Sequence, residues 1–159
     1  MRFFRIVPPA AVALALALGF ASLSLAGPLR AAKPGAAKAK DLATIEREAF
    51  TITIKDAKAK AGTEALVLVT VKAKGKFHLN QEYPHKLTVE EVPAGLKLEK
   101  MELRKADAAL DEHTLSFKMV ATPEKPGKYS LTAVLKTSVC DDKQCILRSE
   151  KIALQVVGK

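Results

Sequence analysis

YSLTAVLK, residues 129–136, decides the fold class of this 159-residue chain. Its apolar side chains fall on every second position, with Tyr129 and Leu135 at the two ends. Successive side chains of a strand point to opposite faces, so this alternation predicts a half-buried β-strand. Six other segments alternate in the same way or are rich in β-branched residues. They are residues 50–55, 66–71, 87–90, 96–101, 115–120 and 151–157.

Glycine and proline residues separate these segments, for example Gly62, Gly75 and Pro123. Short strands divided by turn residues are typical of two packed sheets. We therefore predict an all-β, immunoglobulin-like two-sheet β-sandwich of about seven strands. In such sandwiches a tyrosine at the start of the penultimate strand often bonds nearby backbone, and Tyr129 follows a Pro-Gly turn. Tyr129 as a plain core aromatic is the alternative. Only residues 106–111 offer a short helical turn.

The first 26 residues have the pattern of a secretory signal. Arg2 and Arg5 precede an uncharged, Ala- and Leu-rich run over residues 10–26, and Ser24 and Ala26 are small residues at a cleavage point. This arrangement predicts a cleaved signal peptide over residues 1–26. An uncleaved anchor is the alternative, although the run is at the lower limit for crossing a bilayer. We expect a periplasmic or secreted mature protein that does not span the membrane.

Residues 27–45 are predicted to be a flexible basic linker, and residues 46–159 the folded domain. The linker consists mainly of Ala, Lys, Gly and Pro, which cannot bury an apolar face. A basic arm that contacts membrane or cell wall is the alternative. The whole chain carries a formal charge of +9, but its basic residues form no stripe, aromatic residues are 5% and Trp is absent. We expect no nucleic-acid partner.

The two cysteines of the chain, Cys140 and Cys145, enclose the polar residues DDKQ. Strands before and after them predict a hairpin with the cysteines as the last facing pair. Facing residues of a non-hydrogen-bonded pair have Cα atoms about 4.5 Å apart, a separation that permits a disulfide. Export would place this disulfide in an oxidising compartment.

A disulfide at this place has two readings. It closes a small ring, so it stabilises by only about 2 kcal/mol, and its position at a hairpin tip suits thiol–disulfide exchange. Small hairpin disulfides without a redox task are also common in secreted domains. Asp141 and Asp142 disfavour a thiolate, while Lys143 and Lys136 favour one, so no strongly activated thiol is expected.

The region from residue 75 to residue 157 resembles the N-terminal periplasmic domain of the thiol:disulfide interchange protein DsbD. The resemblance rests on GKFHLNQEYPHKLTVEEVPAGLKLEK (75–100), HTLSFKMVATPEKPGKYSLTAVL (113–135), the cysteine pair and a closing strand. It implies an immunoglobulin-like domain in which Cys140 and Cys145 are the catalytic redox pair. Electrons would come in trans from a thioredoxin-like or DsbD-type membrane redox protein and pass to oxidised periplasmic proteins.

A copper carrier is a third hypothesis, because histidine and methionine are ligands for copper. The candidates are His78, His85, His113, Met101 and Met119. The two methionines lie on apolar periodicity, however, and are assigned to the core. We expect neither a metal nor a cofactor.

Four residues of one loop offer a rim beside the cysteine tip: Phe77, His78, Asn80 and Tyr83. A solvated loop is the alternative. Two functions are therefore carried forward from the sequence. One is an exported thiol–disulfide exchange domain with oxidoreductase-type activity, and the other is a non-enzymatic secreted binding module with a structural disulfide.

Overall fold

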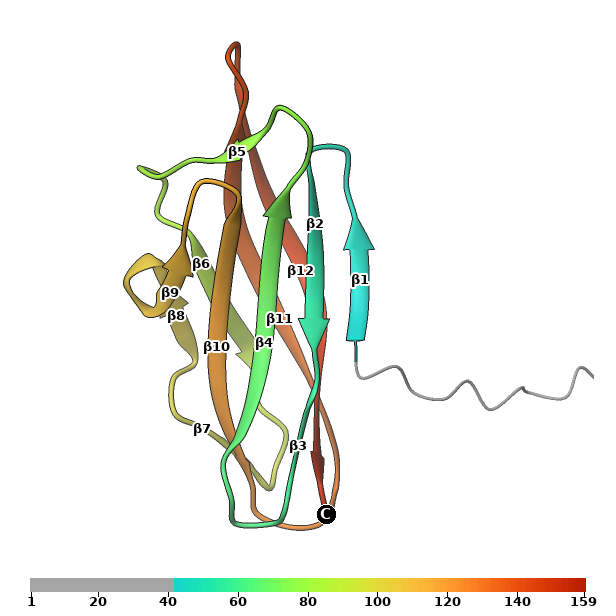
Figure 1. Cartoon of the computed structure of the whole chain (residues 1–159). Helices are drawn as coiled ribbons and strands as arrows, with labels where there is room; N and C mark the ends of the chain where they lie inside the picture. Colours follow the sequence, from blue (N-terminus) through green and yellow to red (C-terminus); the bar gives the residue numbers. More distant parts are fainter. Residues whose placement is uncertain (1–41) are drawn as a thin grey trace, which may run out of the picture. The chain divides into compact units, whose positions relative to one another are not determined.

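The structure is a computed structural model that describes residues 42–159, which form two β-sheets (Figure 1). The predicted signal peptide and the linker up to residue 41 lie outside the described residues. The first sheet has the order β1 (Leu42–Glu46), β2 (Phe50–Lys55), β4 (Ala65–Ala73), β10 (Thr114–Pro123), β7 (Leu96–Leu98), and β9 (Ala108–Leu110) also pairs with β10. The second sheet has the order β3 (Ala57–Ala59), β12 (Cys145–Gly158), β11 (Gly127–Cys140), β6 (Lys86–Glu91), β8 (Glu102–Arg104), and β5 (His78–Leu79) also pairs with β11.

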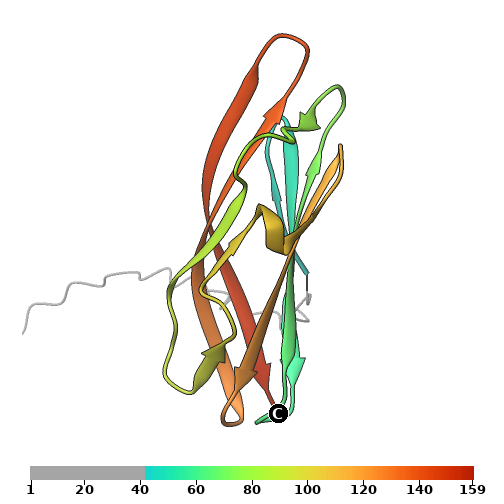
Figure 2. The same cartoon turned by 90° about the vertical axis from the view of Figure 1, so that its left-hand side faces the viewer.

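This strand order is that of an immunoglobulin-like sandwich. Strands β2, β4, β10 and β7 take the places of strands A, B, E and D, and β6, β11 and β12 take those of C, F and G. All pairings are antiparallel except that of β3 with β12. Figure 2 shows the two sheets from the side, facing each other. The predicted fold class is confirmed.

The core lies between the sheets and is filled by the alternating residues of both inner faces. Among the largest fully buried side chains are Phe50, Ile52, Phe117, Leu131, Leu135 and Leu154. In β11 the inward positions run from Tyr129 through Leu135 to Val139; all of them are buried, and all but Thr137 belong to the hydrophobic core. The alternation read from the sequence therefore sets the buried face, as the pleat of a strand requires.

Tyr129 takes the role that its position predicts. Its hydroxyl donates to the carbonyl of Lys125 at 2.9 Å, across the turn that leads into β11. Gly95 lies against the ring, because a Cβ at this residue would stand 3.3 Å from the tyrosine oxygen, and its φ is +85°. A larger residue at position 95 would meet both the ring and an unfavourable backbone conformation.

The structure corrects three details of the sequence analysis. Residues 42–45, assigned to the linker, form most of the edge strand β1, whose exposed residues show no apolar alternation. The short helical turn expected within residues 106–111 is the 3₁₀ turn η1 (Lys105–Asp107), which begins one residue earlier, and β9 takes up the next three residues. Met101, assigned to the core, is 51% exposed, whereas Met119 is buried as expected.

The described residues contain twelve strands, more than the seven predicted. Most of the additional ones, such as β3, β5 and β8, have two or three residues, too few to show a period. Within residues 42–159 the single helical element is η1, and no helix there has the length and hydropathy to cross a membrane.

Candidate functional site

The cysteine hairpin closes the two long strands β11 and β12, which stay in register to their last pair. That pair is Cys140 and Cys145, joined by a disulfide with Cα atoms 4.0 Å apart. Beyond it the backbone N–H of Asp141 donates to the carbonyl of Gln144 at 2.9 Å. The predicted hairpin and the facing cysteines are confirmed, with a Cα separation somewhat shorter than ladder geometry predicts.

Asp141 organises the tip of this hairpin. One carboxylate oxygen accepts hydrogen bonds from the backbone N–H groups of Lys143, at 2.9 Å, and Gln144, at 3.0 Å. The other oxygen lies 2.8 Å from Nζ of Lys76, in the loop before β5. The bond to Lys76 and the backbone donors lower the pKa of Asp141 to about 2. A carboxylate that stays charged therefore lies directly after Cys140.

The two cysteines differ in exposure. Cys145 is exposed, whereas Cys140 is buried, with only 6% of its surface accessible. Val139 lies in the core, so Cys140 points to the opposite face of the sheet. On the side of β11 away from β12, β5 pairs with the end of the strand, with His78 opposite Cys140. A reagent in solution therefore meets Cys145 first.

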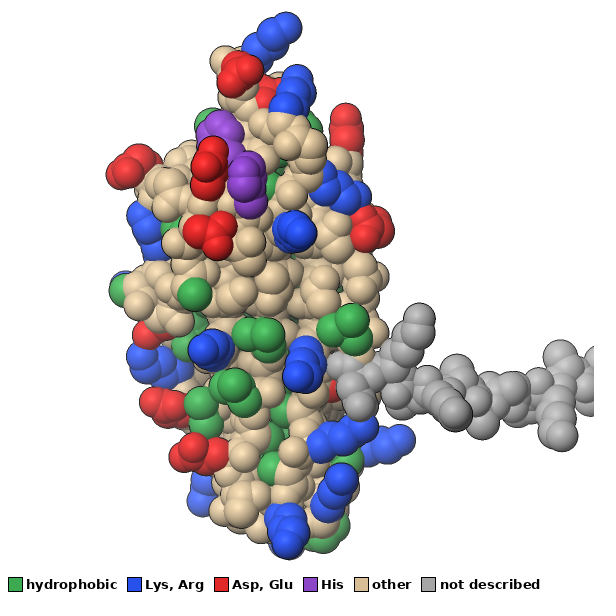
Figure 3. Space-filling model, in the orientation of Figure 1, with side chains coloured by type: hydrophobic (Ala, Val, Ile, Leu, Met, Phe, Trp, Pro, Cys, Tyr) green, Lys and Arg blue, Asp and Glu red, His purple; other side chains and the backbone are tan. Residues whose placement is uncertain are grey.

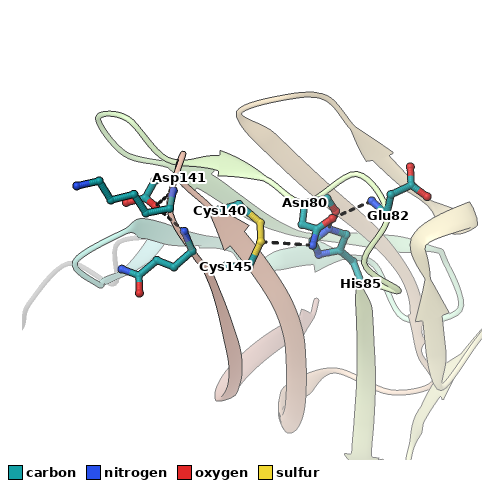
Figure 4. The surroundings of a disulfide bond; sticks show 8 residues. Asn80, Glu82, His85, Cys140, Asp141 and Cys145 are labelled. Carbon is teal, nitrogen blue, oxygen red and sulfur yellow. Dashed lines mark hydrogen bonds between the residues drawn. A yellow bond between two sulfur atoms is a disulfide. The ribbon is translucent and has the colours of Figure 1, made fainter.

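Asn80 connects the loop after β5 to the disulfide (Figure 4). Its side-chain Oδ1 accepts a hydrogen bond from the backbone N–H of Glu82 at 3.0 Å. This bond directs the amide nitrogen Nδ2 toward Sγ of Cys145, 3.9 Å away. The backbone N–H of Asn80 donates to the carbonyl of Ser138 at 3.1 Å. The loop thus contacts both strands of the hairpin.

His85 holds the other end of the same loop. Its ring is buried, with Nε2 2.8 Å from the carbonyl of Asn80 and Nδ1 3.0 Å from the hydroxyl of Thr137. A carbonyl can only accept, so Nε2 carries the proton and Nδ1 accepts from Thr137. Burial lowers the pKa of His85, and the positive charge of Lys105 lowers it further, against the effect of the bond to Asn80.

The rim predicted from the sequence is present in part. His78 and Asn80 lie beside the disulfide, as the pairing and the hydrogen bond show. Tyr83 instead packs edge-on against the ring of His85, with centroids 5.2 Å apart. Phe77 packs on the margin of the core, and Nζ of Lys76 lies 5.8 Å from the centroid of its ring.

The geometry does not favour the copper hypothesis. Both ring nitrogens of His85 have protein partners, so this residue offers no free ligand atom. Met119 is enclosed in the core. Within residues 42–159, no three side chains of His, Cys, Asp or Glu gather at distances that could hold an ion.

The sequence analysis did not identify two residues of the site, Lys76 and Ser138. It named His85 only as a candidate metal ligand and did not predict its burial beneath the loop. Lys76 and His85 reach the hairpin only because the loop around β5 folds onto it. Asn80 and Glu82 did carry a local signal, since an asparagine that accepts from the backbone two residues on is a common turn device. No comparable signal marks Ser138, whose backbone carbonyl accepts from the N–H of Asn80.

Charged side chains of both signs are interspersed over the face seen in Figure 3, and histidines lie near the end that carries the hairpin. Hydrophobic side chains also appear on this face, over the outer side of the first sheet. Leu66, which is 51% exposed, pairs there with Val120. The described part of this face carries no stripe of a single charge.

Comparisons with known proteins add little to this geometry. No protein-family model matches the chain, and no curated protein matches it. Solved structures with a similar fold include the GAE domain of GGA2p from Saccharomyces cerevisiae, at 6% identity and a TM-score of 0.44, covering 71% of this chain and 96% of that one. AggA, the major subunit of aggregative adherence fimbriae type I from Escherichia coli, is similar at 8% identity and a TM-score of 0.38, covering 74% and 99%.

A PapD-like domain of human CEP192 is similar at 9% identity and a TM-score of 0.33, covering 72% of this chain and 88% of that one. These scores and identities are low, so the fold assignment rests on the strand order and register described above. The protein is an immunoglobulin-like sandwich with one disulfide. A disulfide of this kind is typical of proteins outside the cytoplasm.

Proposed function

We propose that this protein is an exported thiol–disulfide exchange domain whose redox pair is Cys140 and Cys145. The observation that carries the proposal is the unequal exposure of the two cysteines at the end of a hairpin. A disulfide that serves only to tie strands gains nothing from an exposed cysteine. Exchange requires one, because a thiolate must approach a sulfur in line with the bond that breaks.

In the proposed reaction, the thiolate of a partner dithiol attacks Sγ of Cys145. A bond forms between the partner's sulfur and Sγ of Cys145, the bond between the two cysteines breaks, and its electron pair leaves on Sγ of Cys140. The partner's second thiol then attacks the partner's own sulfur and releases Cys145 as a thiolate. The partner is oxidised to a disulfide, and Cys140 and Cys145 are reduced to two thiols.

The proposed partners follow from the predicted export and from the resemblance to the N-terminal domain of DsbD. The electron donor would be a thioredoxin-like or DsbD-type membrane redox protein, and the acceptors would be oxidised proteins of the periplasm. The predicted signal peptide and the presence of a disulfide both support a location outside the cytoplasm. No metal or cofactor is needed for this chemistry.

A matched pair of single-cysteine variants tests the proposal. In Cys140→Ser, the exposed Cys145 stays available as a thiol but has no neighbouring cysteine to release it. Its thiolate should displace 5-thio-2-nitrobenzoate from a thioredoxin-like protein that lacks its own resolving cysteine and carries this leaving group on its remaining cysteine, and so form a stable mixed disulfide. Cys145→Ser keeps only the buried Cys140 and should form much less of the mixed disulfide. Non-reducing electrophoresis of the two mixtures gives the readout.

The reduction potential of the unaltered domain provides a second test. A value in the range of exchange proteins, roughly −120 to −270 mV, supports the proposal. A value below about −300 mV, together with equal or absent mixed disulfide in the two variants, would contradict it.

That second outcome would favour a binding module with a structural disulfide. One observation supports this alternative, because Asp141 places a lasting negative charge next to Cys140. Together with burial, this charge disfavours the thiolate that exchange must release there. The exchange proposal therefore requires some group that stabilises the released sulfur.

A further inference from the structure

Ser138 is a buried polar residue whose hydroxyl makes no hydrogen bond within residues 42–159 of the oxidised protein. Its side chain is 0% exposed, and its hydroxyl oxygen has no hydrogen-bond partner among the described residues. A buried hydroxyl without a partner is destabilising relative to one that is hydrogen-bonded. Native structures contain few such groups, and an orphaned donor close to a reactive pair points to a partner that exists in another state.

The position of Ser138 identifies that partner. Ser138 and Cys140 are two residues apart on β11, so their side chains share the outer face of the sheet, opposite Val139 in the core. Their Cα atoms are about 7 Å apart, as for any such pair on a strand. The loop that carries Asn80 lies against this part of the strand, since the backbone N–H of Asn80 donates to the carbonyl of Ser138.

The disulfide keeps the two side chains from meeting. It directs Sγ of Cys140 across the hairpin toward Cys145, which is the facing residue on β12. Once this bond opens, rotation about χ1 of Cys140 can turn the sulfur along the strand toward Ser138. The amide of Asn80 does not serve this sulfur, because it contacts Cys145, and Asp141 can only repel a negative charge.

We propose that the Ser138 hydroxyl donates a hydrogen bond to the thiolate of Cys140 when the disulfide is opened. This inference rests on the proposed exchange reaction and names the group that stabilises its leaving sulfur. A partner dithiol, or dithiothreitol in its place, attacks Sγ of Cys145. The electron pair of the broken bond stays on Sγ of Cys140, and Ser138 holds that charge without transferring its proton.

The test isolates Cys140 as the single thiol by means of Cys145→Ser. In this background the thiolate absorbance near 240 nm is followed against pH, with and without Ser138→Ala. A hydrogen bond to a charged group contributes about 1.5–3 kcal/mol, so loss of the hydroxyl should raise the pKa of Cys140 by about one unit or more. Ser138→Thr keeps the hydroxyl and should retain the lower pKa.

Ser130→Ala is the matched control, because Ser130 lies on the same face of β11 but is exposed and far along the strand from the disulfide. It should leave the pKa of Cys140 unchanged. In the domain with both cysteines, Ser138→Ala should slow reduction by dithiothreitol about threefold, since a leaving thiol of higher pKa departs more slowly. Circular dichroism confirms that each variant is folded.

An equal pKa of Cys140 in the presence and absence of the Ser138 hydroxyl would overturn the inference. A shift of the Cys140 pKa in Ser130→Ala as large as the shift in Ser138→Ala would also overturn it. These outcomes are distinct from failure of the proposed function, which the mixed-disulfide experiment measures with Ser138 in place. If Ser138→Ala did not fold, Ser138→Thr would decide alone: a pKa of Cys140 shifted upward in this variant would contradict the proposal.

Discussion

Lys76 and Asp141 form an ion pair of 2.8 Å that joins the loop before β5 to the tip of the cysteine hairpin. The carboxylate of Asp141 also accepts the backbone N–H groups of Lys143 and Gln144, so one side chain both shapes the tip and anchors it to the rest of the domain. Asp141 directly follows Cys140 in the chain. The negative charge of Asp141 therefore stabilises the folded hairpin, whereas it disfavours a thiolate on Cys140.

Asp141→Asn removes the negative charge, and with it the ion pair to Lys76. An asparagine oxygen can still accept from the backbone of Lys143 and Gln144. We expect reduction of the disulfide by dithiothreitol to become about threefold to tenfold faster, because the leaving thiolate is no longer repelled. Asp142→Asn is the control, since Asp142 is exposed at the tip. Equal rates in the two variants would show that the charge of Asp141 has no special effect.

The acid titration of Asp141 makes a second prediction. Its pKa is about 2 in the folded protein against an ordinary value of 3.8. The unfolded chain binds this proton more readily, so the stability that the carboxylate contributes is complete above about pH 5 and declines as the pH falls toward 2. Nuclear magnetic resonance of the carboxyl group against pH checks the value. A midpoint near 3.8 would mean that Lys76 and the backbone donors do not hold the charge in solution.

The contact of Asn80 with Cys145 predicts a contrast between two substitutions. Asn80→Asp keeps an oxygen for the backbone N–H of Glu82 but turns a carboxylate toward the sulfur that an incoming thiolate must reach. Repulsion between two charges about 4 Å apart is worth at least 1 kcal/mol, so we expect reduction to slow about fivefold or more. Asn80→Ala removes the contact without adding charge and should change the rate much less. Measurement at low and high salt distinguishes charge from structure, because only the effect of charge is screened.

His85 predicts a loss of stability in mild acid. Burial lowers its pKa from the ordinary 6.5, so the unfolded chain takes up this proton more readily than the folded protein. The stability that neutral His85 contributes is complete above about pH 7 and declines as the pH falls below 6.5. The melting temperature should therefore fall between pH 7.5 and pH 5.5, and less steeply in His85→Gln. His113→Gln, at an exposed position, should keep the wild-type dependence. If it removes the dependence instead, the assignment to His85 is wrong.

Tyr129→Phe tests the turn that leads into β11. The variant loses the hydrogen bond to the carbonyl of Lys125 and should lower the free energy of unfolding by about 1 kcal/mol, as measured by urea denaturation. Tyr83→Phe is the matched control, since no hydrogen bond of the Tyr83 hydroxyl occurs within residues 42–159. A loss of similar size in both variants would indicate a general effect of the hydroxyl group on solubility or on the unfolded state.

The sheets and the hairpin could be predicted from the sequence because both depend on local order. Alternation along residues 129–136 assigns each side chain to a face, and a short loop fixes which residues of the two adjoining strands pair. For this reason the facing cysteines and the hydrogen bond of Tyr129 were both anticipated. Met101 was misassigned, since an apolar residue in a short turn carries no periodic information.

The sequence alone determined the class of fold, the inner face of each long strand and the meeting of Cys140 with Cys145. Only the tertiary structure decided which sulfur is covered, which cation pairs with Asp141 and why Ser138 is buried. The chain around β5 takes part at all three places, because it pairs with Cys140, supplies Lys76 and donates to the carbonyl of Ser138, some sixty residues later in the chain. Contacts at that separation leave no mark on local periodicity, because they arise only when the sheet brings the two segments together.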